Sequence, residues 1–164
     1  MLGLVIGVPA LVLGMFYALD HHDDPPSDQQ MLANFHQHRT TFNQLVRMAQ
    51  ADKGLTRIGD DWTIPDDPLS VGATPSRIAQ YRKLFGVAGT TSGFGADAES
   101  VEFYYWGHGS AISSDTDKGY IYAKKPPTPI LPSLEGCHPN GENLTFAYRH
   151  IEGNWYLYYK YLPG

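Results

Sequence analysis

Apolar residues at the start of the chain form one uninterrupted run. Residues 2–19 (LGLVIGVPALVLGMFYAL) carry no charged side chain. A helix of this length rises roughly 27 Å, which is just enough to cross a hydrocarbon core of about 30 Å. The run therefore predicts a transmembrane anchor at residues 1–19, and with it a protein whose first partner is the membrane.

Two alternatives to an uncleaved anchor stay open, a cleaved signal peptide and a buried hairpin or misplaced start site. A signal peptide needs a basic first segment and small residues before the cut. Here only the amino terminus precedes the run, and residues 16–20 contain no A-x-A pattern. The first Lys or Arg is Arg39, so the positive-inside rule says little. The acidic segment that follows favours a single pass through the cytoplasmic membrane, with the domain in the periplasm or outside.

Residues 20–28 (DHHDDPPSD) lack apolar side chains and predict a short extended linker, which leaves a single domain at 29–164. Ser27 followed by Gln30 fits a capping box, so a helix should begin there. Gly54 is placed to end it. The apolar residues between them recur at helical spacing: Leu32, Phe35, Phe42, Leu45, Val46 and Ala49.

A second helix is marked by Thr74 as its N-cap, by Pro75 in its first turn, and by Gly86 or Gly89 at its end. Residues 55–73 are rich in turn formers and predict a loop with room for one short strand. From Gly93 onward the pattern is typical of strands. Four segments are rich in aromatic and β-branched residues: 101–106, 119–124, 144–149 and 154–161.

This order of elements predicts an α+β fold: an N-terminal transmembrane helix, then two helices packed on one face of a mainly antiparallel sheet of about four strands. Alternation along the last strand separates two faces. One face carries Trp155, Leu157, Tyr159 and Tyr161, and the other carries Tyr156, Tyr158 and Lys160. Along 101–106, Glu102, Tyr104 and Trp106 alternate with Val101, Phe103 and Tyr105.

The outward face is thus rich in tyrosine, and two interpretations are open. The tyrosines either form cross-strand pairs with exposed hydroxyls, or they bind a protein or saccharide partner. The candidate partner-binding residues are Tyr104, Trp106, Tyr156 and Tyr158.

The amino-acid composition excludes some classes of binding partner. A net charge of -5 and a pI of about 5.7 argue against nucleic acid, which requires a concentrated basic surface. The single cysteine, Cys137, excludes an intrachain disulfide and is either an inert thiol or half of an intermolecular bridge.

Four histidines near the N-terminal end, His21, His22, His36 and His38, are competent metal ligands in principle. His36 and His38 are two apart, which on a helix turns them about 200° from each other, so a solvated segment is the preferred interpretation. The DTDKG segment at 115–119 lacks the glycine and glutamate that a Ca²⁺ loop needs. No metal or cofactor is therefore expected.

His108, Ser110 and Asp115 place a base, a hydroxyl and an acid close in sequence, but no nucleophile-elbow pattern accompanies them. A glycine-rich connection is the preferred interpretation. The PPTPILP segment at 126–132 is either a polyproline II ligand or a crossing between strands. Asn143 begins a glycosylation sequon, which matters only in a eukaryotic secretory route.

The combination of GS at 109–110, KGYIY at 118–122 and YRHIEGNWYLYY at 148–159 resembles a group of small bacterial proteins with an N-terminal membrane segment. The resemblance implies bacterial origin and membrane attachment, and it assigns no activity to any residue.

The leading hypothesis is a non-enzymatic, membrane-anchored accessory domain that engages a protein through its aromatic sheet face or its loops. The alternative is a small envelope enzyme or ligand-binding domain with a site around loops 107–119. A pilin-like subunit is a further alternative, but a pilin helix carries an early glutamate and continues unbroken, whereas Pro25 and Pro26 interrupt this one.

Overall fold

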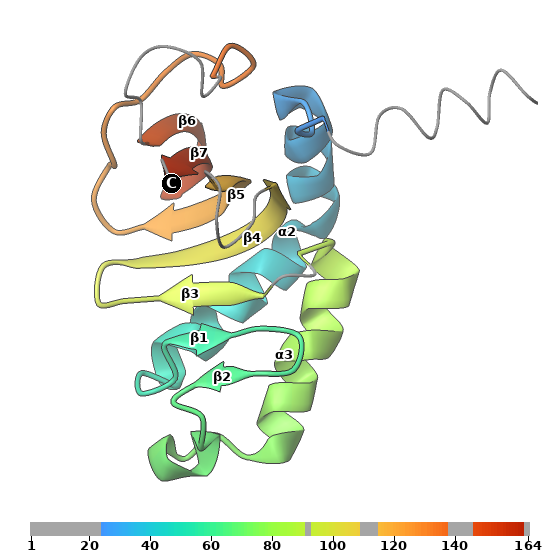
Figure 1. Cartoon of the computed structure of the whole chain (residues 1–164), viewed down its shortest axis with the longest axis vertical. Helices are drawn as coiled ribbons and strands as arrows, with labels where there is room; N and C mark the ends of the chain where they lie inside the picture. The colour runs from blue at the N-terminus through green and yellow to red at the C-terminus, as the bar shows by residue number, and fades with distance from the viewer. Residues whose placement is uncertain (1–23, 91–92, 109–114, 138–145, 163–164) are drawn as a thin grey trace, which may run out of the picture.

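The computed structural model describes residues 24–90, 93–108, 115–137 and 146–162. Within them the chain forms two α-helices, α2 (Asp28–Ala51) and α3 (Pro75–Ala88), and a short 3-10 helix, η1 (Pro68–Val71). Both α-helices lie on the same side of a single sheet (Figure 1). The architecture is therefore two-layered, with one helical layer covering one sheet face.

The sheet has seven strands in the order β2-β1-β3-β4-β5-β7-β6, and every neighbouring pair is antiparallel. The strands are β1 (Arg57–Ile58), β2 (Thr63–Ile64), β3 (Phe94–Ala96), β4 (Ser100–His108), β5 (Asp115–Ala123), β6 (Phe146–Glu152) and β7 (Trp155–Leu162).

The predicted fold class, with a transmembrane helix and about four strands, was therefore wrong. The four predicted strands correspond to β4–β7. The other three, β1–β3, are two or three residues long, and only one short strand was expected within residues 55–73, where both β1 and β2 lie. Such short strands have no readable alternation and are defined by their partners alone. Neither helix of the described chain is long and apolar enough to cross a bilayer, and residues 2–19 lie outside the described ranges.

The helix ends follow from local chemistry. The Ser27 hydroxyl accepts from the Gln30 amide at 3.2 Å while the Gln30 side chain accepts from the Ser27 amide at 2.8 Å, which confirms the capping box. At the other end α2 stops at Asp52, two residues before the predicted Gly54. Thr74 caps α3, and Gly89 ends it with a φ of 71°.

The main core lies between the helices and the sheet and is dominated by packed rings. Phe42 contacts Tyr120 at a centroid distance of 4.7 Å, and Phe35 contacts Trp155 at 5.2 Å. Leu157 and Tyr159 also lie in this core. The prediction that Trp155, Leu157 and Tyr159 face the helices is confirmed.

A buried ion network ties the start of α2 to the sheet. The Asp28 carboxylate is 1% exposed and accepts from the Leu134 amide and from the Arg149 guanidinium, each at 2.8 Å. The ammonium of Lys118, itself 2% exposed, lies 3.4 Å from Asp28 and donates to the Pro26 carbonyl at 2.8 Å. Because the charges and the hydrogen bonds are both matched, the burial of these ions is tolerated.

The proline-rich segment 126–132 connects β5 to β6 and returns along the outer edge of β6. The Leu131 amide donates to the Tyr148 carbonyl at 2.7 Å, and the Tyr148 amide donates to the Pro129 carbonyl at 3.0 Å. Ile130 and Tyr148 form a parallel bridge. Of the two interpretations of this segment, the structure supports the crossing between strands.

Two glycines should respond in opposite ways to alanine. Gly93 has a φ of 89°, and a Cβ there would lie 1.8 Å from the Ile58 carbonyl oxygen. We expect Gly93→Ala to lower the free energy of unfolding by about 2 kcal/mol or more. Gly86 lies on exposed α3 with no atom near its would-be Cβ, so Gly86→Ala should raise that free energy by about 0.5–1 kcal/mol. Urea unfolding of both variants measures this, and a neutral Gly93→Ala would contradict the described turn.

Candidate functional site

The outward tyrosines are the first candidate site. In the structure, the side chains of Tyr156 and Tyr158 are buried. Tyr156 and Tyr158 lie on the sheet face opposite the helices, in a second buried cluster with Ile121. Their exposed fractions are 4% and 2%. The predicted face is correct, but exposed hydroxyls at these two positions are not found. They pack among their neighbours on the sheet, so they offer little surface to a partner.

Gly119 explains how the Tyr158 ring fits against the sheet. It is the register partner of both Tyr104 and Tyr158, and a Cβ at this position would lie 2.6 Å from Tyr158 Cε1. The absent side chain leaves room for the ring to lie over the β5 backbone. A glycine across from an aromatic residue was the available sequence signal for this packing.

Trp106 does not share the face of Tyr104. The β4–β5 register pairs Tyr104 with Gly119 and Trp106 with Lys118, so Tyr105 is an extra residue in a β-bulge. Lys118 is also the partner of Tyr159, which lies in the helix-side core. Cross-strand partners share a face, so Trp106 lies on the helix side. The four predicted partner-binding residues therefore do not form one surface.

Electrostatics agree with a closed outer face. Burial raises the pKa of Glu102, against the attraction of Lys160 and Arg57, which lowers it. Burial, and then the nearby Glu102 carboxylate, raise the pKa of Tyr158 well above its ordinary value. Among the residues that the structure describes, the Tyr158 hydroxyl has no hydrogen-bond partner. These are the properties of a packed surface rather than of a wet recognition patch.

The other predicted clusters are only partly visible. His108 ends β4 and pairs with Thr116, next to Asp115 at the start of β5, but Ser110 lies outside the described residues. His21, His22 and Asn143 also lie outside them. His36 and His38 are on α2, and nowhere in the described chain do three or more His, Cys, Asp or Glu residues converge as metal ligands.

Cys137 is a free thiol, 8% exposed. Burial raises its pKa, which disfavours the reactive thiolate. This environment supports the interpretation of an inert thiol over that of an intermolecular bridge.

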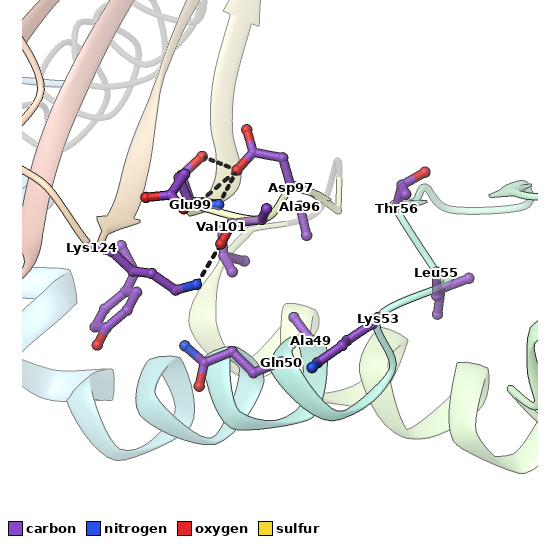
Figure 2. Close-up of a pocket in the computed structure, with 13 residues that line it drawn as sticks. Ala49, Gln50, Lys53, Leu55, Thr56, Ala96, Asp97, Glu99, Val101 and Lys124 are labelled. Atoms are coloured by element: carbon purple, nitrogen blue, oxygen red, sulfur yellow. Dashed lines mark hydrogen bonds between the residues drawn. The ribbon is translucent and has the colours of Figure 1, made fainter.

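A second candidate is a cavity that the sequence did not indicate. It has a volume of about 630 Å³ and lies between the C-terminal end of α2, the turn joining β3 to β4, and the end of β5 (Figure 2). We call it the turn cavity. Its lining consists of Ala49, Gln50, Lys53, Leu55, Thr56, Ala96, Asp97, Ala98, Glu99, Ser100, Val101, Tyr122 and Lys124.

The cavity lies where the chain leaves the end of α2 at Ala51 and turns back before β1 begins at Arg57. After Asp52 the chain turns back, with the Leu55 amide donating to the Asp52 carbonyl at 2.8 Å. Thr56 then meets the end of β3, where the Ala96 amide donates to the Thr56 carbonyl at 2.7 Å. The side chains facing the gap are mainly small, so the helix end and the β3–β4 turn do not fill it.

The cavity has an apolar floor and a polar rim. Leu55, Val101 and Ala49 are buried, with exposed fractions of 1%, 4% and 5%. Lys53 and Gln50 extend from α2 on one side, and Lys124 reaches in from the opposite side (Figure 2). Such a combination is typical of sites for small organic ligands.

The β3–β4 turn is held by its own aspartate. The Asp97 carboxylate accepts from the Glu99 and Ser100 amides, each at 2.7 Å, and from the Ser100 hydroxyl at 3.2 Å. Burial acts to raise the pKa of Asp97, but these hydrogen bonds and nearby Lys124 outweigh it and leave the pKa lowered. Asp97 is therefore ionised and engaged within the turn, which gives the rim a fixed shape.

A second, more open hollow of about 450 Å³ lies beside Trp62, Pro68 and Arg82. The Arg82 guanidinium in its wall donates to the Gly59 carbonyl at 3.2 Å. Because it is smaller and more open, it would enclose less of a ligand than the turn cavity does.

Comparison of the chain with known proteins found no similar protein. No protein-family model matches the chain, and neither the curated proteins nor the solved structures give a significant match.

Proposed function

We propose that this protein is a non-enzymatic binding domain that holds a small organic molecule in the turn cavity. The observation that carries the proposal is the cavity itself, because its volume of about 630 Å³ and its apolar floor with a polar rim suit a drug-sized ligand. The sequence predicts a protein partner bound through the aromatic sheet face or the loops, or alternatively a ligand site around loops 107–119. The turn cavity, which is bounded by residues 97–100, is a different site from either of these.

The chemistry of the lining supports binding rather than catalysis. None of the lining residues is a histidine or a cysteine. The Asp97 carboxylate is engaged by turn amides, and Glu99 pairs with Lys125 at 3.4 Å. The predicted enzyme site at 107–119 includes residues 109–114, which the structure does not describe, so it stays a prediction.

The position of the cavity leaves it accessible from the far end of the domain. Residues 1–23 join the domain next to the N-terminus of α2, whereas Ala49, Gln50 and Lys53 line the cavity at the other end. A helix of 24 residues is about 36 Å long. The cavity therefore lies about one helix length from the described residue that follows this segment, whose membrane attachment stays a prediction.

Filling the cavity tests the proposal. Ala98 is exposed at the cavity wall, so in Ala98→Phe the new ring should cover the opening. Ala79→Phe, at an exposed position on α3, is the matched control. A library of small amphiphiles is screened by ligand-observed NMR against the full-length chain in nanodiscs. Hits should be lost in Ala98→Phe and retained in Ala79→Phe, and hits that survive Ala98→Phe would place binding elsewhere.

A further inference from the structure

We infer that the turn cavity selects organic carboxylates, with Lys53 as the residue that contacts the carboxylate and the apolar floor holding the rest of the molecule. This inference rests on the proposed function and names its ligand class. Three features of the lining carry it: the unused hydrogen-bond donors, the placement of the two lysines, and the charge balance of the rim.

The first feature is that the two lysines of the rim have N–H groups that are free to donate hydrogen bonds to a ligand. Lys53 makes no hydrogen bond or ion pair with any described residue, so its three N–H groups are free. Lys124 donates to the Ala98 carbonyl and keeps two further N–H groups. On the Asp97 carboxylate, Oδ1 accepts from three donors within the turn. A ligand that carries an acceptor can therefore use the free N–H groups of the two lysines.

The second feature is the direction from which the lysines approach. Lys53 follows the C-terminus of α2, and Lys124 follows β5 on the opposite side of the cavity (Figure 2). Leu55 and Val101 contribute buried apolar surface to the same lining. A carboxylate at the rim would meet an ammonium while its hydrocarbon part covers the floor. Hydrogen bonds between an ammonium and a carboxylate are stronger than neutral ones.

The third feature is the balance of charge. Lys53 and Lys124 oppose Asp97 and Glu99 in the lining, so the formal sum is zero. Lys125 lies outside the lining and pairs with Glu99 at 3.4 Å. Including Lys125 makes the local charge positive, which favours an anionic over a cationic ligand.

The test compares three probes with one apolar body: 3-phenylpropanoate, 3-phenylpropan-1-ol and 3-phenylpropylamine. Their affinities for the full-length chain in nanodiscs are measured by equilibrium dialysis at low salt, with empty nanodiscs as the blank. We expect the carboxylate to bind about fivefold to tenfold more tightly than the alcohol, and the amine to bind most weakly. Equal affinities, tighter binding of the amine, or no binding of any probe would overturn the inference.

Lys53→Gln assigns the contact. It should reduce the affinity for 3-phenylpropanoate to that of the alcohol and leave the alcohol unchanged. Lys83→Gln, at an exposed position on α3, is the matched control and should change neither. If all probes bind alike but Ala98→Phe abolishes binding, the proposed function stands and the carboxylate inference fails. If binding persists in Ala98→Phe, the proposed function itself is contradicted.

Discussion

Replacing Asp28 by asparagine should lower the free energy of unfolding by about 3–5 kcal/mol, because it leaves a buried cation without its counter-charge. Lys118 is 2% exposed, and Asp28 is the anion paired with it. The amide also weakens the charge-assisted bond from Arg149. Urea unfolding followed by circular dichroism measures the loss.

Two control variants separate this effect from a general loss of packing. Glu152→Gln removes the exposed pair with Arg39 and should cost less than about 1 kcal/mol. The double variant Asp28→Asn with Lys118→Met should recover part of the loss, because the buried ammonium that lacks its counter-charge in Asp28→Asn is removed. If the double variant is less stable than Asp28→Asn alone, the buried cation is not the cause.

The same carboxylate makes stability depend on pH. Burial alone would raise the pKa of Asp28, but the hydrogen bonds from Leu134 and Arg149 and the attraction of Lys118 leave it lowered. The folded state therefore binds this proton less readily than the unfolded state. The stabilisation is present above the ordinary carboxyl pKa and is lost as the pH falls through the lowered value. The difference between the parent and Asp28→Asn should shrink in acid.

Tyr158→Ala should cost about 3–5 kcal/mol, although the residue lies on the face away from the helices. Its side chain is 2% exposed and packs in the second cluster with Tyr156 and Ile121. Trp155→Ala, in the main core, should cost a similar amount. Equal losses would show that both faces of the sheet are packed, whereas a loss below about 1 kcal/mol for Tyr158→Ala would restore an exposed aromatic face.

Tyr158→Phe separates the ring from its hydroxyl. The hydroxyl is buried and has no hydrogen-bond partner in the described part of the chain, so removing it should be neutral or should stabilise the protein by up to about 1 kcal/mol. Thermal unfolding of the three forms gives the order expected: phenylalanine at least as stable as tyrosine, and alanine far below both. A clear loss in Tyr158→Phe would show that the hydroxyl has a partner.

The sequence predicts well where a few neighbouring residues determine the outcome. Ser27 with Gln30 marks the start of α2, and Thr74 with Pro75 marks the start of α3, because a cap is a contact within one turn. Strands β4–β7 are long enough for their aromatic alternation to be recognised. The two-residue strands β1 and β2 are not, because they exist only through pairing with each other and with β3.

The burial of the outer face and the turn cavity could not be predicted from the sequence, because both depend on contacts between distant segments. Alternation gives the face of Tyr158 but not what packs over it, and the bulge at Tyr105 depends on the partner strand. The turn cavity brings together residues from 49–56, 96–101 and 122–124. Their small and polar side chains carry no motif, and their proximity follows from where α2 ends.

The proline-rich segment beside β6 has a consequence for how molecules of this protein meet one another. An open sheet edge offers unpaired amides and carbonyls on which another chain can add a strand. At one edge of this sheet β2 is two residues long, and at the other Pro129 and Leu131 occupy the backbone groups of Tyr148. Proline itself cannot donate a hydrogen bond to an incoming strand. In its described part, the sheet therefore has one edge strand of two residues and one edge that the proline-rich segment covers at Tyr148, and both features disfavour the addition of a strand from another copy.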